Sequence, residues 1–141
     1  MATSDILVGK WTYRSFHNRA AMVDGVADAA LKLIFAEATF TFALSDSTTL
    51  EGAIDWDGGG LDISGTVAPA TATSPLSVAL IGSGRPNTDT AGWEYDYRGA
   101  LAYEWPNGVN QIPALVGTVI RAKPHNGSPA GYVASFIAVK Q

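Results

Sequence analysis

The chain has 141 residues, a formal net charge of −4 and no cysteine. This length fits one domain with a sizeable core, which we expect to span residues 1–141. The missing cysteines exclude disulfides, thiolate metal sites and cysteine nucleophiles, and the acidic balance disfavours nucleic-acid binding, which needs a basic face.

The sequence lacks the usual signals for export, metal binding and covalent catalysis. Residues 1–5 carry no signal-peptide pattern, and no apolar run approaches the ~20 residues of a membrane-spanning helix. The two histidines are far apart, and no Gly-x-Ser-x-Gly motif or phosphate-binding loop is found. We therefore expect a cytoplasmic protein with no membrane partner, and we assign no catalytic residue, metal ligand or cofactor.

The N-terminal part begins with an alternating run at residues 6–17. A period of two places every second side chain on one face of a β-strand. Here that face carries Leu7, Gly9, Trp11, Tyr13, Ser15 and His17. Asp24 is suitable as the cap of a short helix over 24–30. A second strand is predicted over 37–44, where Thr and Phe alternate, with a possible extension back through 31–36.

Three further strands are predicted at 48–56, 61–67 and 76–82. The first of these places Trp56 on the same face as Leu50 and Ile54. A run of one aspartate and three glycines follows Trp56, and such residues tolerate the positive φ angles of a hairpin. The next two runs are therefore read as a continuation of the same antiparallel sheet.

The sixth run, 93–105, is the longest and most aromatic. One face of it carries Trp93, Tyr95, Tyr97, Leu101, Tyr103 and Trp105. We interpret this face as a cavity wall, with core packing and a subunit interface as the alternatives. Turn-forming residues separate it from the last two predicted strands, 114–123 and 132–140.

About eight strands with short connections predict an all-β, single-domain antiparallel up-and-down barrel. Parallel β-α-β units are disfavoured because no long helical segments separate the runs. Closure would also remove exposed strand edges. A two-sheet sandwich has the same alternation and is the alternative fold.

The motif Gly9-Lys10-Trp11-Thr12 on the first strand resembles the opening of the calycin superfamily, the avidins and lipocalins. The resemblance implies a ligand-holding barrel with Gly9 and Trp11 at a closed end and Arg121, or alternatively Lys140, as the cation over the indole. For avidin-like members it also implies a dimer or tetramer. The strand-seven Trp-Lys pair of the avidins is not found, so we expect no biotin site.

We expect the barrel to bind a small, largely hydrophobic or aromatic molecule in its interior. The candidate ligand-binding residues are aromatic or polar side chains on cavity-capable faces: Trp11, Tyr13, Ser15, His17, Trp56, Tyr95, Tyr97, Tyr103 and Trp105. His17 also fits a hydrogen-bonded strand end, and His125 is expected to lie in solvent.

Two other functions stay open at this stage. One is a barrel enzyme that carries out proton transfer or isomerisation on a hydrophobic metabolite, which requires a titratable group with a perturbed pKa in the cavity. The other is a homo-oligomeric assembly module, a dimer or tetramer, that uses the aromatic face to contact a second copy.

Overall fold

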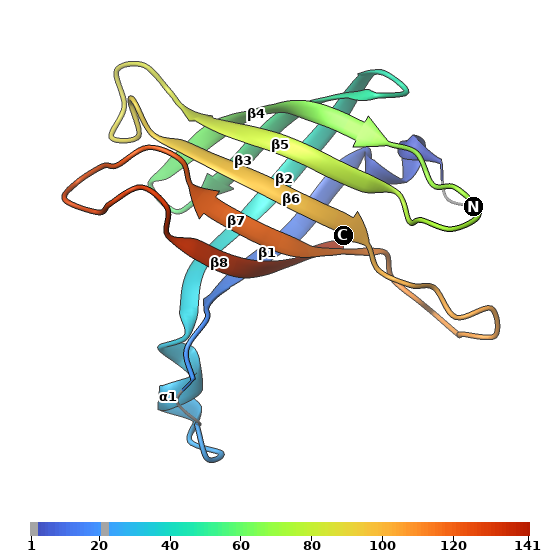
Figure 1. Cartoon of the computed structure of the whole chain (residues 1–141), viewed down its shortest axis with the longest axis horizontal. Helices are drawn as coiled ribbons and strands as arrows, with labels where there is room; N and C mark the ends of the chain where they lie inside the picture. Colours follow the sequence, from blue (N-terminus) through green and yellow to red (C-terminus); the bar gives the residue numbers. More distant parts are fainter. Residues whose placement is uncertain (1–2, 21–22) are drawn as a thin grey trace.

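A computed structural model describes residues 3–20 and 23–141. Eight antiparallel strands form one closed barrel, in which each strand pairs with its sequence neighbours and the last pairs with the first (Figure 1). The predicted up-and-down barrel is therefore confirmed, and the sandwich is not formed. The strands are β1 (Gly9–His17), β2 (Ile34–Asp46), β3 (Thr49–Trp56), β4 (Gly59–Ala68), β5 (Ser77–Gly84), β6 (Glu94–Leu101), β7 (Ala114–Arg121) and β8 (Val133–Lys140).

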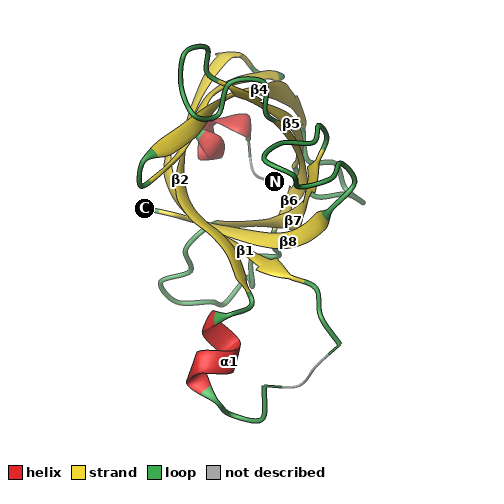
Figure 2. Cartoon of the chain, turned by 90° about the vertical axis from the view of Figure 1, so that its left-hand side faces the viewer, coloured by secondary structure: helices red, strands yellow, loops and turns green. Residues whose placement is uncertain are grey.

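Two short helices lie outside the barrel wall. The 3-10 helix η1 (Ser4–Leu7) precedes β1, and α1 (Ala27–Leu31) lies in the excursion between β1 and β2. Figure 2 looks into the ring of strands and shows α1 projecting away from it. In the two described stretches of chain, no helix is both long and apolar enough to cross a membrane.

The period-two alternation decides which side chains enter the barrel. On β1, Trp11, Tyr13 and Ser15 are each 2% exposed or less, whereas the intervening Thr12 and Arg14 are only half-buried. The other strands contribute inner rows of the same kind, rich in Leu, Ile, Val and aromatic residues. Burial of these rows is the main favourable term in the stability of the fold.

Two glycines on the inner face of the barrel lie at positions that have no room for a Cβ atom. Gly99 on β6 and Gly117 on β7 are register partners. A Cβ atom at Gly99 would lie 2.9 Å from the Phe136 ring, and one at Gly117 would lie 1.9 Å from the carbonyl oxygen of Arg98. Both sites therefore exclude any larger residue without movement of the barrel wall.

One end of the barrel is closed by β1 and η1. Trp11 is fully buried, and its Nε1 donates a hydrogen bond of 2.9 Å to the carbonyl oxygen of Leu7, itself fully buried at the end of η1. Lys140 on β8 is the register partner of Trp11, and its Nζ donates to the carbonyl oxygen of Ile6 at 2.7 Å. The helix is thus fastened over the indole by two hydrogen bonds.

The prediction that Arg121 lies over the Trp11 ring is wrong. In an up-and-down barrel the odd-numbered strands all run in the same direction, so the last residue of β7 lies at the same end as the last residue of β1. Arg121 accordingly pairs with Tyr95 at the open end, whereas Trp11 is near the start of β1. The predicted alternative, Lys140, is the basic residue beside Trp11.

The sixth strand is shorter than the sequence predicted. It ends at Leu101, and residues 102–113 form a loop that projects from the closed end of the barrel (Figure 1). The loop contains Pro106 and Pro113, which lack the N–H donor that a continuing strand needs. Its apolar side chains therefore leave the inner row of β6.

Replacing Trp11 by alanine should lower the free energy of unfolding by about 3–5 kcal/mol, because it leaves a cavity at the closed end and removes the bond to η1. Chemical denaturation followed by circular dichroism measures this change. The matched control is Trp105→Ala, a 69% exposed side chain whose removal should change stability by no more than about 0.5 kcal/mol. Equal effects of the two substitutions would contradict the assigned roles.

Candidate functional site

The open end of the barrel contains a cavity of about 470 Å³. Side chains from six of the strands and from three connecting loops surround it. The lining residues are Tyr13, Phe35, Ala36, Glu37, Ile54, Trp56, Asp57, Leu61, Trp93, Tyr95, Tyr97, Val119, Arg121 and His125. Most of these side chains are apolar or aromatic, so the cavity suits a largely apolar molecule.

Four aromatic rings form the base of the cavity, which we call the aromatic floor: Tyr13, Phe40, Tyr97 and Phe136. The ring centroid of Tyr13 lies 5.0 Å from that of Phe40 and 5.5 Å from that of Phe136, and Phe40 lies 5.4 Å from Tyr97. Most of these pairs meet edge to face, a favourable geometry for aromatic rings. The floor separates the cavity from the packed closed end.

Two of the floor residues also carry hydroxyl groups. Burial raises the pKa of both phenols, Tyr13 and Tyr97, and each is raised further by nearby tyrosines. The Ser15 hydroxyl is close enough to Tyr13 to lower its pKa in part, yet no described residue offers Ser15 Oγ a hydrogen bond of acceptable geometry. Both phenols are therefore neutral over the physiological pH range.

One wall of the cavity consists of three nearly parallel rings, the Trp–His stack: Trp56, Trp93 and His125. The two indoles have centroids 6.2 Å apart at 17°, and the imidazole of His125 lies 3.7 Å from Trp93 at 13°. Trp56 is the last residue of β3, whereas the other two rings come from loops that meet over the barrel end. All three rings line the cavity.

Loop hydrogen bonds hold the two loop-borne rings in place. The N–H of Trp93 donates to the carbonyl oxygen of Thr90 at 2.9 Å, and the buried Thr90 hydroxyl donates to the carbonyl oxygen of Gly60 at 2.8 Å. His125 begins a tight turn closed by two backbone hydrogen bonds to Ser128. The central residues of that turn are an Asn-Gly pair with positive φ, the usual composition of a type I′ hairpin turn.

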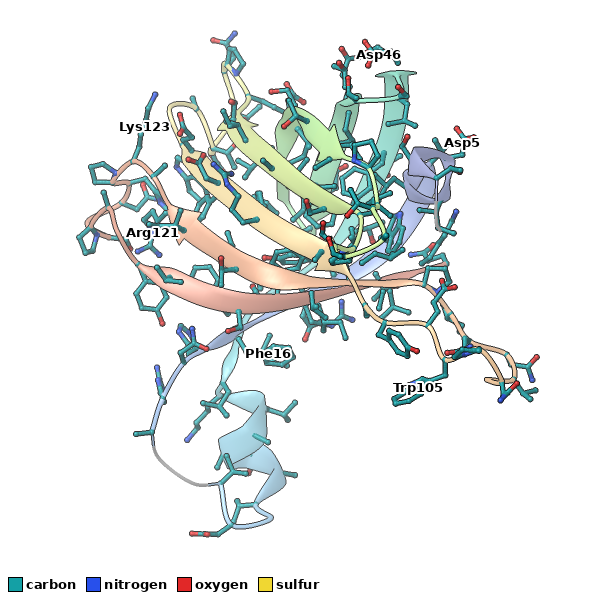
Figure 3. All side chains as sticks on the ribbon, turned by 45° about the vertical axis from the view of Figure 1, so that its right-hand side comes forward. Asp5, Phe16, Asp46, Trp105, Arg121 and Lys123 are labelled. Carbon is teal, nitrogen blue, oxygen red and sulfur yellow. The ribbon has the colours of Figure 1, made fainter. Side chains whose placement is uncertain are left out.

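A second wall is built around Arg121, and we call it the arginine cluster: Arg121, Phe35, Tyr95 and Tyr132. The guanidinium carbon lies 5.8 Å from the Phe35 centroid, 5.7 Å from that of Tyr95 and 5.3 Å from that of Tyr132. These are cation–π distances. Arg121 is only 8% exposed, and it also donates a hydrogen bond to the carbonyl oxygen of Pro129 in the loop after β7. Figure 3 shows Arg121 at the end of β7.

A hydrogen-bond chain links the two walls. Arg121 Nε donates to the Tyr95 hydroxyl at 3.0 Å, and that hydroxyl is 2.7 Å from His125 Nε2. Since arginine can only donate, the phenol oxygen accepts the bond from Arg121. The other ring nitrogen of His125, Nδ1, is buried without a hydrogen-bond partner in the described part of the chain.

The structure corrects the expectation that His125 lies in solvent. It is half-buried against Trp93, and both burial and the positive charge of Arg121 lower its pKa. The prediction failed because the sequence places His125 in a turn without showing that the turn folds back across the barrel end. The nearby Asn-Gly pair was a signal of the turn, although not of its direction.

The other histidine, His17, lies at the rim of the barrel as the last residue of β1. Its Nδ1 is hydrogen-bonded to the Tyr132 hydroxyl, and its ring meets Phe35 edge-on at 5.2 Å. Burial, and to a smaller extent Arg19, lowers its pKa. His17 therefore supports the arginine cluster from outside and does not line the cavity.

Four of the nine predicted ligand-binding residues line the cavity: Tyr13, Trp56, Tyr95 and Tyr97. Trp11 and Ser15 point into the barrel and are fully buried, but neither is among the residues that line the cavity. Tyr103 and Trp105 lie in the projecting loop, 70% and 69% exposed, far from the open end (Figure 3).

The prediction omitted four side chains that dominate the cavity walls: Phe35, Trp93, Arg121 and His125. Trp93 belonged to the aromatic face of the sixth run, and Arg121 continues the apolar inner row of β7 after Val119. The sequence signal that could have identified Arg121 as a cavity residue was therefore its position as a charged residue at the end of an apolar inner row. No comparable signal exists for Phe35, because the position of its side chain depends on the register shift between β1 and β2 next to Ser15.

Among residues 3–20 and 23–141, no group of three or more His, Cys, Asp or Glu side chains is suitable for a metal ion. The chain matches no protein-family model, and no curated protein is significantly similar to it. The closed eight-stranded barrel is compatible with a calycin-like architecture. The function must therefore be argued from the cavity.

Both histidines should titrate below the ordinary value of 6.5 when followed by NMR, because burial disfavours the charged imidazolium. Their neutral forms thus contribute stability above pH 6.5 that is lost as the pH falls through the folded-state pKa values. Arg121→Gln should raise the pKa of His125 slightly and leave the pKa of His17 unchanged. Arg19→Gln should raise the pKa of His17 slightly and leave the pKa of His125 unchanged. An unchanged His125 pKa in folded Arg121→Gln protein would contradict the described geometry.

Proposed function

We propose that this protein binds one small, largely aromatic or hydrophobic molecule in the cavity at the open end of the barrel. The observation that carries the proposal is the contrast between the two halves of the interior. Below the aromatic floor the barrel is filled with side chains, whereas above it about 470 Å³ lies between the Trp–His stack and the arginine cluster. An 8-stranded barrel has room for one such ligand.

The cavity has the features of a preformed binding site. Its size falls within the range of small-molecule pockets, about 300–1,000 Å³. The indoles and the inner aliphatic side chains provide apolar area whose burial by a ligand is worth about 25 cal/mol per Å². Because hydrogen bonds and ring contacts already hold both walls, little ordering is needed on binding.

A relationship to the calycins, which are ligand-holding barrels, supports this function. The Gly-Lys-Trp motif lies at the start of β1, and the indole is buried under η1 at the closed end. The strand-seven Trp-Lys pair of the avidins is not found in the sequence, which favours a ligand other than biotin. A cytoplasmic location, a function without a cofactor and the alternative of a barrel enzyme all stay predictions.

Filling the cavity should abolish binding. Ala36 on β2 lines the cavity, so Ala36→Trp should prevent saturable binding of the neutral fluorescent probe N-phenyl-1-naphthylamine. The matched control is Ala43→Trp, which adds the same side chain to the exposed outer face of β2. The wild type and the control should bind one probe per chain in a fluorescence titration. Absence of saturable binding to the wild type would overturn the proposal.

We also propose that two copies associate through the outer face of β7 and β8. Five exposed apolar side chains lie on the outer faces of β7, β8 and the adjoining end of β1, the β7–β8 patch: Phe16, Val116, Ile120, Val133 and Ile137. Val116 pairs with Ile137 and Ile120 with Val133, and the polar pair Thr118–Ser135 lies between these two apolar pairs. Such patches are typical of protein interfaces.

Ile137→Lys should convert the associated form to a monomer, because it places a charge within an apolar contact. Light scattering over a concentration series measures the mass. The control Val109→Lys changes an 83% exposed side chain in the projecting loop and should leave the mass unchanged. A wild-type monomer at high concentration would refute the second proposal and leave the first intact.

A further inference from the structure

We propose that the molecule held in the cavity is a planar aromatic acid whose carboxylate pairs with Arg121. The inference rests on the proposed binding function and adds the charge of the ligand. It starts from the state of the Arg121 side chain, which lines the cavity and is only 8% exposed. A guanidinium remains protonated in proteins, so this side chain is a buried positive charge.

The partners of Arg121 are all neutral. Nε donates to the Tyr95 hydroxyl at 3.0 Å and Nη1 donates to the carbonyl oxygen of Pro129 at 3.2 Å. These bonds use two of the five N–H groups of arginine, and Nη2 has no partner within residues 3–20 and 23–141. The ion pairs found in those stretches involve Arg14, Arg85 and Lys123 instead.

The surrounding rings do not replace a counter-charge. Phe35, Tyr95 and Tyr132 offset part of the lost hydration of Arg121 through cation–π contacts. They carry no net negative charge, however, and a buried charge without a partner of opposite sign is costly. An anionic ligand supplies that partner, and a carboxylate matches the planar donor geometry of the guanidinium.

The two acidic side chains at the cavity do not serve this purpose. Glu37 and Asp57 are both exposed at the rim, where water and salt screen their charges. Glu37 is also 3.8 Å from Arg14 on the outer wall. Neither forms an ion pair with Arg121 in the described chain. The strongest field inside the cavity is therefore that of Arg121.

The remaining walls define the body of the ligand. Trp56 and Trp93 line one side of the cavity as nearly parallel rings, and the floor tyrosines add aromatic groups with neutral hydroxyls. A planar ring system fits between such surfaces. An acid group at one end of that ring system would then lie against Arg121, whose partner Tyr95 also contacts Trp93 and His125.

The test compares two nearly isosteric probes, 2-naphthoate and 2-naphthamide, by calorimetry at pH 7 with the full chain. The wild type should bind naphthoate about tenfold to a hundredfold more tightly than the neutral amide, as expected for a charge-assisted hydrogen bond. Arg121→Gln should remove this preference and retain binding of the amide. The control Arg98→Gln makes the same change in net charge on the exposed outer face of β6 and should keep the preference.

Each outcome decides between the two proposals. Equal binding of both probes to the wild type overturns the acid-binding inference and leaves the binding function intact. Failure of both probes to bind overturns both. If the preference for naphthoate over the amide persists in Arg121→Gln, Arg121 is not the partner of the carboxylate. If that variant does not fold, Arg121→Lys keeps the charge without the planar fork and should reduce the preference for naphthoate.

Discussion

The pairing of β1 with β8 is the interaction on which the rest of the structure depends. It runs from Trp11 opposite Lys140 to His17 opposite Ala134, and it converts an open sheet into a closed tube. Closure brings β7 and its Arg121 across from β2 and its Phe35, so the arginine cluster exists only in the closed form. The same closure satisfies the backbone groups of both terminal strands, which would otherwise form exposed edges.

Within the tube, large and small side chains divide the interior into a filled and a hollow half. Gly99 on the inner face of β6 leaves room for Phe136, and the aromatic floor then spans the barrel. Above the floor, indoles and tyrosines stand at the walls and leave space between them. The polar atoms there are linked into one chain, from Arg121 through Tyr95 to His125, which fixes the walls and leaves part of the guanidinium unpaired.

The sequence predicted the strands well and the site only in part. Tyr13, Trp56, Tyr95 and Tyr97 were identified because each belongs to a regular inner row, and such rows follow from the period of two. Tyr103 and Trp105 were included because the same period was extended past Leu101, where the chain leaves the sheet, and they lie outside the cavity. Loop residues such as His125 do not follow the period-two alternation of a strand, so the direction of their side chains could not be predicted.

The sequence by itself determined a series of short antiparallel strands, since hydrophobic alternation and turn-forming residues are local properties of the chain, whereas the choice of a closed barrel over a two-sheet sandwich depended on the pairing of β1 with β8. It also determined which side chains share a face, including Trp11 with Tyr13 and Ser15. Only the tertiary structure decided that the cavity lies at the end opposite Trp11 and that Arg121 and His125 belong to it. The physical reason is that both facts depend on contacts between strands and loops far apart in the sequence, whose packing no local pattern encodes.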